Sequence, residues 1–181
     1  KRVLLIDSDL RNPSLHRTLG LDNSKGLSTC LSGGAKPAEC IHPAQVANLF
    51  LLPSGPLPPS PAELLSGPRM MSLLAQASER YDHVILDAPP VLGLADAPIL
   101  GSISKGTLFV VEAGKTRVSI AQTAIKRLFG ARARLLGAVL TKFDPKNAGY
   151  GYGYGSGAYA YLGYDYYGAG SGAPARRLGR G

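Results

Sequence analysis

Short apolar runs alternate along the chain with stretches of helical spacing, and turn residues separate them. Buried parallel strands are typically continuous apolar, partly β-branched runs, and the predicted strands are 3–7, 47–52, 84–87, 107–111 and 135–140. Residues spaced as on a helix face, with prolines and glycines at the ends, predict helices at 14–19, 26–31, 61–65, 70–77, 96–103 and 118–129, and residues 37–40 are interpreted as part of a connection. Strands that alternate with helices indicate an α/β fold, with a parallel sheet and helices on both faces.

Two of these strands end in carboxylates. Asp7 and Asp9 follow the first apolar run, Arg11 lies near the same rim, and Asp87 closes the run at 84–87. Ligands of open parallel sheets bind beyond the carboxyl ends of the strands. Asp7 and Asp9 are two residues apart, so in an extended segment their side chains leave on the same side, where two carboxylates can serve one hard cation, or one cation and one proton. Solvated loop charges at a strand end are the alternative interpretation of the opening stretch.

Composition narrows the class of protein. A chain of 181 residues with 45% apolar residues fits one domain of common size. No run approaches the roughly 20 apolar residues that span a bilayer. Cys30 and Cys40 lack zinc-site spacing, which favours reduced structural thiols. The net charge of +8 suits an acidic membrane surface, nucleic acid or a phosphorylated partner, although several arginines lie in the last few residues.

The end of the chain is rich in tyrosine, glycine and alanine. Its tyrosines are Tyr150, Tyr152, Tyr154, Tyr159, Tyr161, Tyr164, Tyr166 and Tyr167. A segment with so few aliphatic residues cannot bury enough apolar surface to order itself. Taken alone, the segment indicates a low-complexity linker or an aromatic tract that promotes association.

Three segments together carry a resemblance to a known family. Residues 3–13, 55–65 and 84–90, followed by the tyrosine cluster, resemble the bacterial tyrosine kinases of capsule and exopolysaccharide export. In that family the first segment matches the Walker A-prime motif and the third matches the Walker B motif. The resemblance implies a P-loop NTPase fold of the deviant-Walker type, with ATP and Mg²⁺ as cofactors.

The resemblance also implies roles for individual residues. Asp7 and Asp9 are implied to lie near the metal and the incoming tyrosine hydroxyl, with Asp7 as the acceptor of the tyrosine proton, although the choice between the acids stays open. Asp87 is implied to hold a water of the magnesium shell. Arg11 and Thr141 are implied to contact the nucleotide, and the eight clustered tyrosines are implied to accept the phosphoryl group.

The sequence departs from the family pattern at two places. The Gly-Lys-Ser/Thr turn that cradles the phosphates lies upstream of the A-prime strand in the family, and none stands before Asp7. The triplet Gly114-Lys115-Thr116 lacks the required spacing and is interpreted as the loop after the strand at 107–111. Thr141 stands where relatives tend to carry an asparagine, and a hydroxyl cannot make the paired donor and acceptor contacts of an amide.

The missing segment has a structural consequence. We predict an N-terminally truncated nucleotide-binding kinase domain over 1–146 and a flexible Gly/Tyr-rich tail over 147–181. The sheet is expected to have a gap beside residues 3–7, with exposed backbone groups and apolar side chains. The chain as given is therefore expected neither to bind ATP tightly nor to fold cooperatively.

The resemblance implies partners and a location as well. A ring of identical subunits acting in trans, a membrane activator or polysaccharide co-polymerase domain that is fused or separate, and a site at the cytoplasmic face of the plasma membrane are implied. No nucleic-acid partner is expected, because no helix or aromatic platform organises the basic end. Two alternatives are a partition or septum-placement ATPase, which would use water as acceptor, and a non-catalytic regulator of polysaccharide chain length.

Overall fold

The computed structural model describes residues 1–144. Residues 1–142 form one compact unit, and Phe143 and Asp144 belong to a second one. The tail predicted over 147–181, with all eight of its tyrosines, lies outside the described residues. The boundary predicted at residue 146 therefore stays a prediction.

Every predicted strand and helix is present in the described part of the chain. The strands are β1 Val3–Asp7, β2 His42–Pro43, β3 Leu49–Leu52, β4 His83–Asp87, β5 Thr107–Glu112 and β6 Leu135–Thr141. The helices are α1 Leu15–Thr18, α2 Leu27–Ser32, α3 Pro37–Cys40, α4 Pro61–Ser66, α5 Pro68–Arg80, α6 Asp96–Ile103 and α7 Val118–Gly130. The sequence did not predict β2, because Pro43 cannot donate to a ladder; the structure places this strand at a sheet edge, where proline is tolerated.

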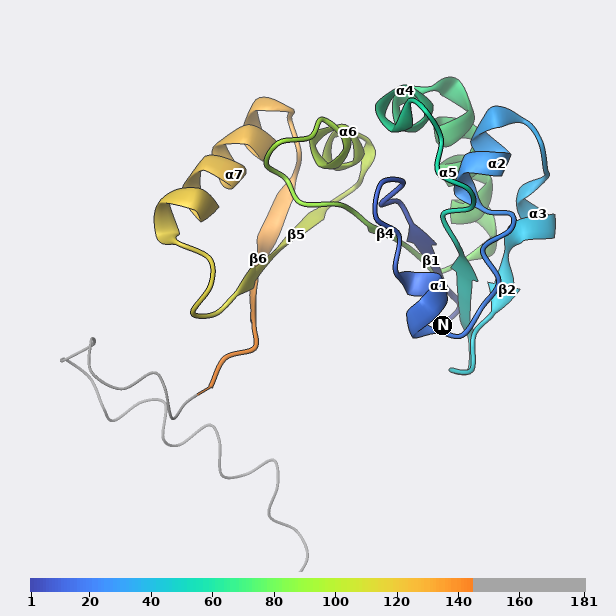
Figure 1. Cartoon of the computed structure of the whole chain (residues 1–181), viewed down its shortest axis with the longest axis horizontal. Helices are drawn as coiled ribbons and strands as arrows, with labels where there is room; N and C mark the ends of the chain where they lie inside the picture. Colours follow the sequence, from blue (N-terminus) through green and yellow to red (C-terminus); the bar gives the residue numbers. More distant parts are fainter. Residues whose placement is uncertain (145–181) are drawn as a thin grey trace, which may run out of the picture. The chain divides into compact units, whose positions relative to one another are not determined.

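The first sheet has the order β2-β3-β1-β4 (Figure 1). Strand β1 pairs in parallel with both β3 and β4, and β2 pairs antiparallel with β3. The prediction of a gap beside residues 3–7 is therefore wrong, since β1 is hydrogen-bonded on both sides. Strand β4 pairs with β1 alone and is an edge of this sheet. Apolar pattern identifies strands but does not give their order in space, which explains the misplaced gap.

Strands β5 and β6 form a second, separate parallel sheet. Phe109 of β5 packs with Ala124 and Leu128 of α7 in a small core of its own. Apolar side chains of β4, β5 and β6 are exposed, among them Ile85, Leu108, Val110, Leu136 and Leu140.

The main core lies between the first sheet and helices α2, α5 and α6. Pro68 occupies the first turn of α5, where its missing N–H costs nothing, and Met70, Leu73 and Ala77 recur on one face of the helix. These side chains pack in one buried cluster with Leu4 and Ile6 of β1. Each fully buried large apolar side chain contributes roughly 1.5–3 kcal/mol, so this face holds α5 on the sheet.

The loop after β3 is locked to the turn before α2. Gly26 approaches it so closely that an added Cβ would lie 2.2 Å from the Pro53 oxygen and 2.3 Å from the Gly55 nitrogen. Gly55 has φ of 76°, which favours glycine. Asn23 accepts from the Gly55 N–H at 2.8 Å and donates its amide to the Gly55 oxygen at 3.2 Å. These contacts fix the proline-rich loop 53–60 at the carboxyl end of β3.

Candidate active site

Asp7 and Asp87 lie beside each other at the carboxyl ends of neighbouring strands. They are register partners in the parallel ladder of β1 and β4, and the Ser8 N–H donates to the Asp87 carbonyl oxygen at 2.9 Å. Partners in a parallel register direct their side chains to the same face of the sheet. The two strand-end acids that the sequence singled out are therefore brought together.

Asp7 is fully buried and only half of its carboxylate is satisfied. Its Oδ2 accepts from the Ser14 N–H at 3.2 Å and the Leu15 N–H at 3.0 Å, at the start of α1. Its Oδ1 is buried with no hydrogen-bond partner among residues 1–144. Burial raises the pKa of Asp7, the Leu15 and Ser14 N–H groups oppose that rise, and the Asp9 charge adds to it. A buried, unpartnered carboxylate oxygen is suited to a cation.

Asp9 shapes the turn that follows β1. Its Oδ1 accepts from the Arg11 N–H at 3.1 Å and from the Asn12 N–H at 2.9 Å. This pattern is an Asx turn, in which the side chain replaces a backbone acceptor. The sequence predicted Asp9 and Asp7 on one side of an extended segment, but β1 ends at Asp7 and Asp9 lies in the turn.

Asp87 responds to the other two acids. The residue is exposed, yet partial burial of its carboxyl, then the Asp7 charge and then the Asp9 charge raise its pKa. The three carboxylates therefore share one electrostatic environment in which a cation would relieve repulsion. Within residues 1–144, no three or more His, Cys, Asp or Glu side chains are grouped to hold a metal directly. Mg²⁺ commonly takes only one or two carboxylates and completes its shell with waters and phosphate oxygens, so these residues fit Mg-nucleotide.

Arg11 is anchored by a residue that the sequence analysis missed. Its Nε donates to Asp96 Oδ2 at 2.7 Å and its Nη2 donates to Asp96 Oδ1 at 3.2 Å. Asp96, the first residue of α6, is fully buried, whereas the Arg11 side chain is 40% exposed. A signal was available in the sequence, because Asp96 stands among apolar residues, and a buried carboxylate almost always needs a cationic partner.

Thr141 belongs to the second sheet, and the triplet Gly114-Lys115-Thr116 follows one of its strands. Thr141 ends β6, and its hydroxyl donates to the Val111 oxygen at 3.2 Å. No hydrogen bond within residues 1–144 joins Thr141 to the three acids, so its proposed nucleotide contact stays a prediction. Gly114 and Lys115 lie in the turn after β5, where Lys115 Nζ is 3.4 Å from Glu112 Oε2. That placement confirms the interpretation of the triplet as a loop.

Searches for relatives give a consistent result by sequence. The chain matches no model of a protein family. It is 41% identical over 140 residues to the tyrosine-protein kinase YwqD of Bacillus subtilis, which covers 77% of this chain and 59% of YwqD. It is 39% identical over 150 residues to the tyrosine-protein kinase Wzc of Salmonella typhimurium, which covers 83% of this chain and 21% of Wzc. The chain therefore spans little more than half of YwqD and about a fifth of Wzc.

Solved structures give the same answer by fold. The kinase domain of Escherichia coli tyrosine kinase ETK superposes with a TM-score of 0.78 at 33% identity, covering 86% of this chain and 61% of that one. The cell division ATPase MinD of Pyrococcus furiosus superposes with a TM-score of 0.63 over 77% of this chain and 58% of its own, and at 23% identity it shares the fold alone. Among the described residues, no helix is both long and apolar enough to cross a membrane. The chain is homologous to the bacterial tyrosine-protein kinases, and its fold is that of their kinase domains and of MinD-like P-loop ATPases.

Proposed function

We propose that this chain carries the catalytic acids of an ATP-dependent protein-tyrosine kinase. The kinase phosphorylates its own tyrosine-rich segment and regulates the synthesis and export of exopolysaccharide or capsule. One observation supports the proposal most directly: Asp7 and Asp87 are register partners, and Asp7 keeps a buried carboxylate oxygen without a partner. The homology to tyrosine-protein kinases supports the same assignment.

Each acid has its own task toward Mg-ATP. Asp7 Oδ1 and the Asp9 carboxylate are the proposed metal-side ligands, and Asp87 binds a water of the magnesium shell. When bound, Mg²⁺ neutralises charge on the phosphates of ATP during transfer. Arg11 has N–H groups beyond the two that Asp96 engages, and we assign these to the nucleotide phosphates. Thr141 is assigned to the adenine end of the nucleotide.

Phosphoryl transfer also needs a group that takes the tyrosine proton. Asp7 is the proposed acceptor, because its N–H contacts from Ser14 and Leu15 hold it in place. In the transfer, the tyrosine oxygen forms a bond to the γ-phosphorus, the bond to ADP breaks, and the phenolic proton passes to Asp7.

The proposed acceptors are the eight tyrosines of residues 150–167. Each phosphotyrosine adds about −1.5 to −2 charges at neutral pH, so half of the eight would roughly cancel the net charge of +8. Phosphorylation is then a charge switch. An unmodified segment docks on an adjacent subunit, and a modified one is repelled or released, which changes the assembly.

The proposed setting is the cytoplasmic face of the plasma membrane. There the kinase forms a ring-like homo-oligomer that phosphorylates in trans, together with a membrane activator or polysaccharide co-polymerase domain, fused or separate. The family resemblance supports these partners, and the relatives include the putative tyrosine-protein kinases CapB of Staphylococcus aureus and EpsB of Ralstonia solanacearum.

The test is transfer of radiolabelled γ-phosphate from ATP in the complete gene product that contains this chain. We expect phosphotyrosine on the protein, and its loss when the eight clustered tyrosines are replaced by phenylalanine. Nucleotide binding should persist in that variant, since the acids are untouched. Tyr81→Phe is the matched control, because Tyr81 lies outside the cluster, and its labelling should be normal. Labelling that continues elsewhere in the eight-tyrosine variant would refute the acceptor assignment.

The same assay separates the alternatives. A partition or septum-type ATPase, which the shared fold with MinD brings into consideration, would release free phosphate and form no phosphotyrosine. A non-catalytic regulator would do neither. Asp7→Asn should abolish labelling in the kinase, and unchanged labelling in that variant would remove Asp7 from the proposed mechanism.

A further inference from the structure

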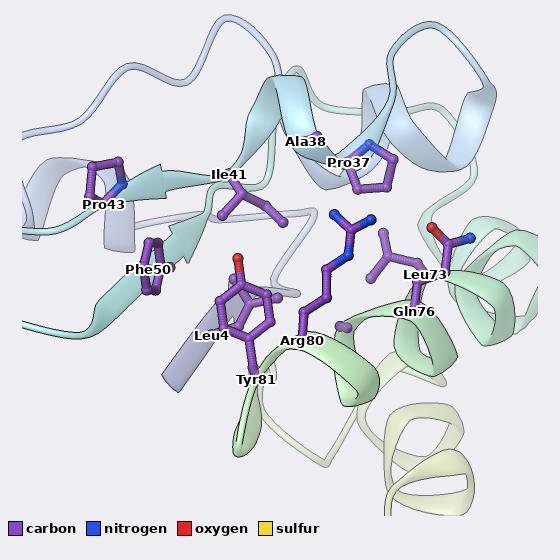
Figure 2. Close-up of a pocket in the computed structure, with 11 residues that line it drawn as sticks. Leu4, Pro37, Ala38, Ile41, Pro43, Phe50, Leu73, Gln76, Arg80 and Tyr81 are labelled. Carbon is purple, nitrogen blue, oxygen red and sulfur yellow. The ribbon is translucent and has the colours of Figure 1, made fainter. Parts of the chain in front are cut away.

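A cavity that none of the three acids lines lies between helix α5, helix α3 and strands β1 and β3. Its volume is about 210 Å³. Figure 2 shows its apolar walls, which include Leu4, Ile41, Phe50 and Leu73. The lining from α5 consists of Leu73, Gln76, Ala77 and Arg80, one face of the helix at successive turns.

Arg80 is the one charged residue among the described residues that line this cavity. It is exposed, and within residues 1–144 its side chain makes no hydrogen bond or ion pair. In Figure 2 the Arg80 side chain extends from the end of α5 toward Pro37 and Ala38. An unpaired guanidinium in an apolar cavity suits a ligand that has an apolar body and one anionic group.

Two further polar side chains, Gln76 and Tyr81, line the cavity. Gln76 Nε2 donates to Ser72 Oγ at 3.1 Å, which uses one of its two N–H groups. Tyr81 contributes a hydroxyl, and its ring is fixed by Phe50 at 5.4 Å between ring centres. The Arg2 guanidinium packs over both rings, 5.2 Å from the centre of Phe50 and 5.1 Å from that of Tyr81. The aromatic wall is therefore rigid and lies beside a second positive charge.

The size of the cavity matches an aromatic ring. An apolar protein cavity of roughly 150 Å³ binds benzene, so 210 Å³ leaves room for a substituted phenyl ring. A phosphate on the ring would pair with the guanidinium of Arg80, and recognition of phosphorylated residues commonly relies on arginine. The chain itself supplies aromatic side chains of this kind, in the tyrosines of residues 150–167.

We propose that this cavity binds a phosphotyrosine side chain from segment 150–167 of a second copy of the chain. Arg80 pairs with the phosphate, and the apolar walls enclose the ring. The inference rests on the proposed function only for the origin of the phosphate. After its release from the acids, the modified segment would bind at this cavity, so that the product of the reaction does not return to the site where it forms.

The test measures binding of a fluorescent peptide of residues 156–168, with or without phosphate on Tyr161, to the phosphatase-treated chain. We expect the phosphopeptide to bind roughly tenfold more tightly than the plain peptide, because a charge-assisted hydrogen bond contributes about that much to affinity. Arg80→Gln should abolish that difference. Arg134→Gln is the matched control, because it removes one exposed arginine that does not line the cavity. Ala38→Phe fills the cavity from its exposed rim without changing the charge, and it should weaken the binding of both peptides.

Three results would overturn the proposal. Equal binding of the two peptides would show apolar docking alone, and displacement by inorganic phosphate at the same concentration would show a simple anion site. Reduced thermal stability of Arg80→Gln with unchanged binding would mean that Arg80 only offsets the partial negative charge at the end of α5. The synthetic phosphopeptide needs no kinase activity, so failure of the proposed function would leave this measurement intact.

Discussion

Asp96 holds Arg11 by two hydrogen bonds, at 2.7 and 3.2 Å, from a fully buried position at the start of α6. This pair ties the turn that follows β1 to a helix 85 residues later in the sequence. Asp9 fixes the backbone of the same turn through the Arg11 and Asn12 N–H groups. Asp96 therefore positions the guanidinium of Arg11, and Asp9 positions its main chain.

Replacement of Asp96 by asparagine should loosen Arg11. Asparagine keeps the shape and one acceptor but loses the charge, so the buried partner of the guanidinium is weakened. We expect a loss of about 1–3 kcal/mol in unfolding free energy, and a lower rate of phosphotyrosine formation in the complete gene product. Chemical denaturation and the labelling assay measure the two effects. Glu79→Gln, at an exposed position of α5, is the matched control and should change neither.

Replacement of Asp87 by asparagine should stabilise the ligand-free protein at neutral pH. The pKa of Asp87 is raised above its ordinary value of 3.8. Between these two pKa values, the folded state keeps a proton on Asp87 that the unfolded state has already released. The resulting penalty is absent below pH 3.8, grows as the pH rises through the raised pKa, and is constant above it. Thermal melting from pH 3.5 to 8 should show the variant gaining over the wild type as the pH rises.

Asp82→Asn provides the control of opposite sign. The Arg2 N–H lowers the pKa of Asp82, so this carboxylate stabilises the folded state at neutral pH and the contribution disappears as the pH falls through the lowered pKa. Asp82→Asn should therefore lower the melting temperature at pH 7. A melting temperature of Asp87→Asn that is lower than wild type at pH 7 would contradict the repulsion among Asp7, Asp9 and Asp87.

Replacement of Gly26 by alanine should damage the contact between loop 53–60 and α2. The new Cβ would lie 2.2 Å from a backbone oxygen and 2.3 Å from a backbone nitrogen, so the two segments must separate. Overpacking of this kind costs roughly 1–3 kcal/mol. Gly130→Ala is the control, because a Cβ there meets nothing within 4 Å. Urea denaturation measures the stability of both variants and of the wild type. A Gly26→Ala variant as stable as the wild type would show that the two segments can separate freely.

The elements and the strand-end acids could be predicted from the sequence because each depends on local pattern. The apolar run before Asp7 and the run before Asp87 predict strands, and the rule that ligands bind at carboxyl ends predicts a shared edge. The acids Asp7 and Asp87 were placed correctly for that reason. The gap was misplaced because no local pattern reveals that β1 pairs with both β3 and β4.

Asp96 was missed for a different physical reason. Aspartate in the first turn of a helix is common without any partner, since it favours the positive end of the helix dipole. The apolar neighbours of Asp96 hint at its burial, but whether the residue is buried depends on how α6 packs. The cavity beside Arg80 was also beyond reach, because α3, β3 and α5 meet there from separate parts of the sequence.

Cys30 should be inert toward thiol reagents in the folded protein. Burial, and then the neighbouring Cys40 thiol, raise the pKa of Cys30 to about 12, so almost no thiolate forms at neutral pH. Both cysteines are buried and unpaired. Reaction with an aromatic disulfide reagent should be slow in buffer and fast in denaturant. Rapid labelling of the native protein would mean that α2 and α3 open readily.

Among the described residues, strand β4 pairs with β1 on one side only, so its other side has main-chain donors and acceptors without a strand partner there. Extended segments of neighbouring molecules can satisfy these groups by strand addition. Preparations of the polypeptide 1–181 should therefore grow in average mass with concentration, as light scattering would record. That self-association would arise from the backbone itself, and it should continue in an Asp7→Asn variant that cannot phosphorylate.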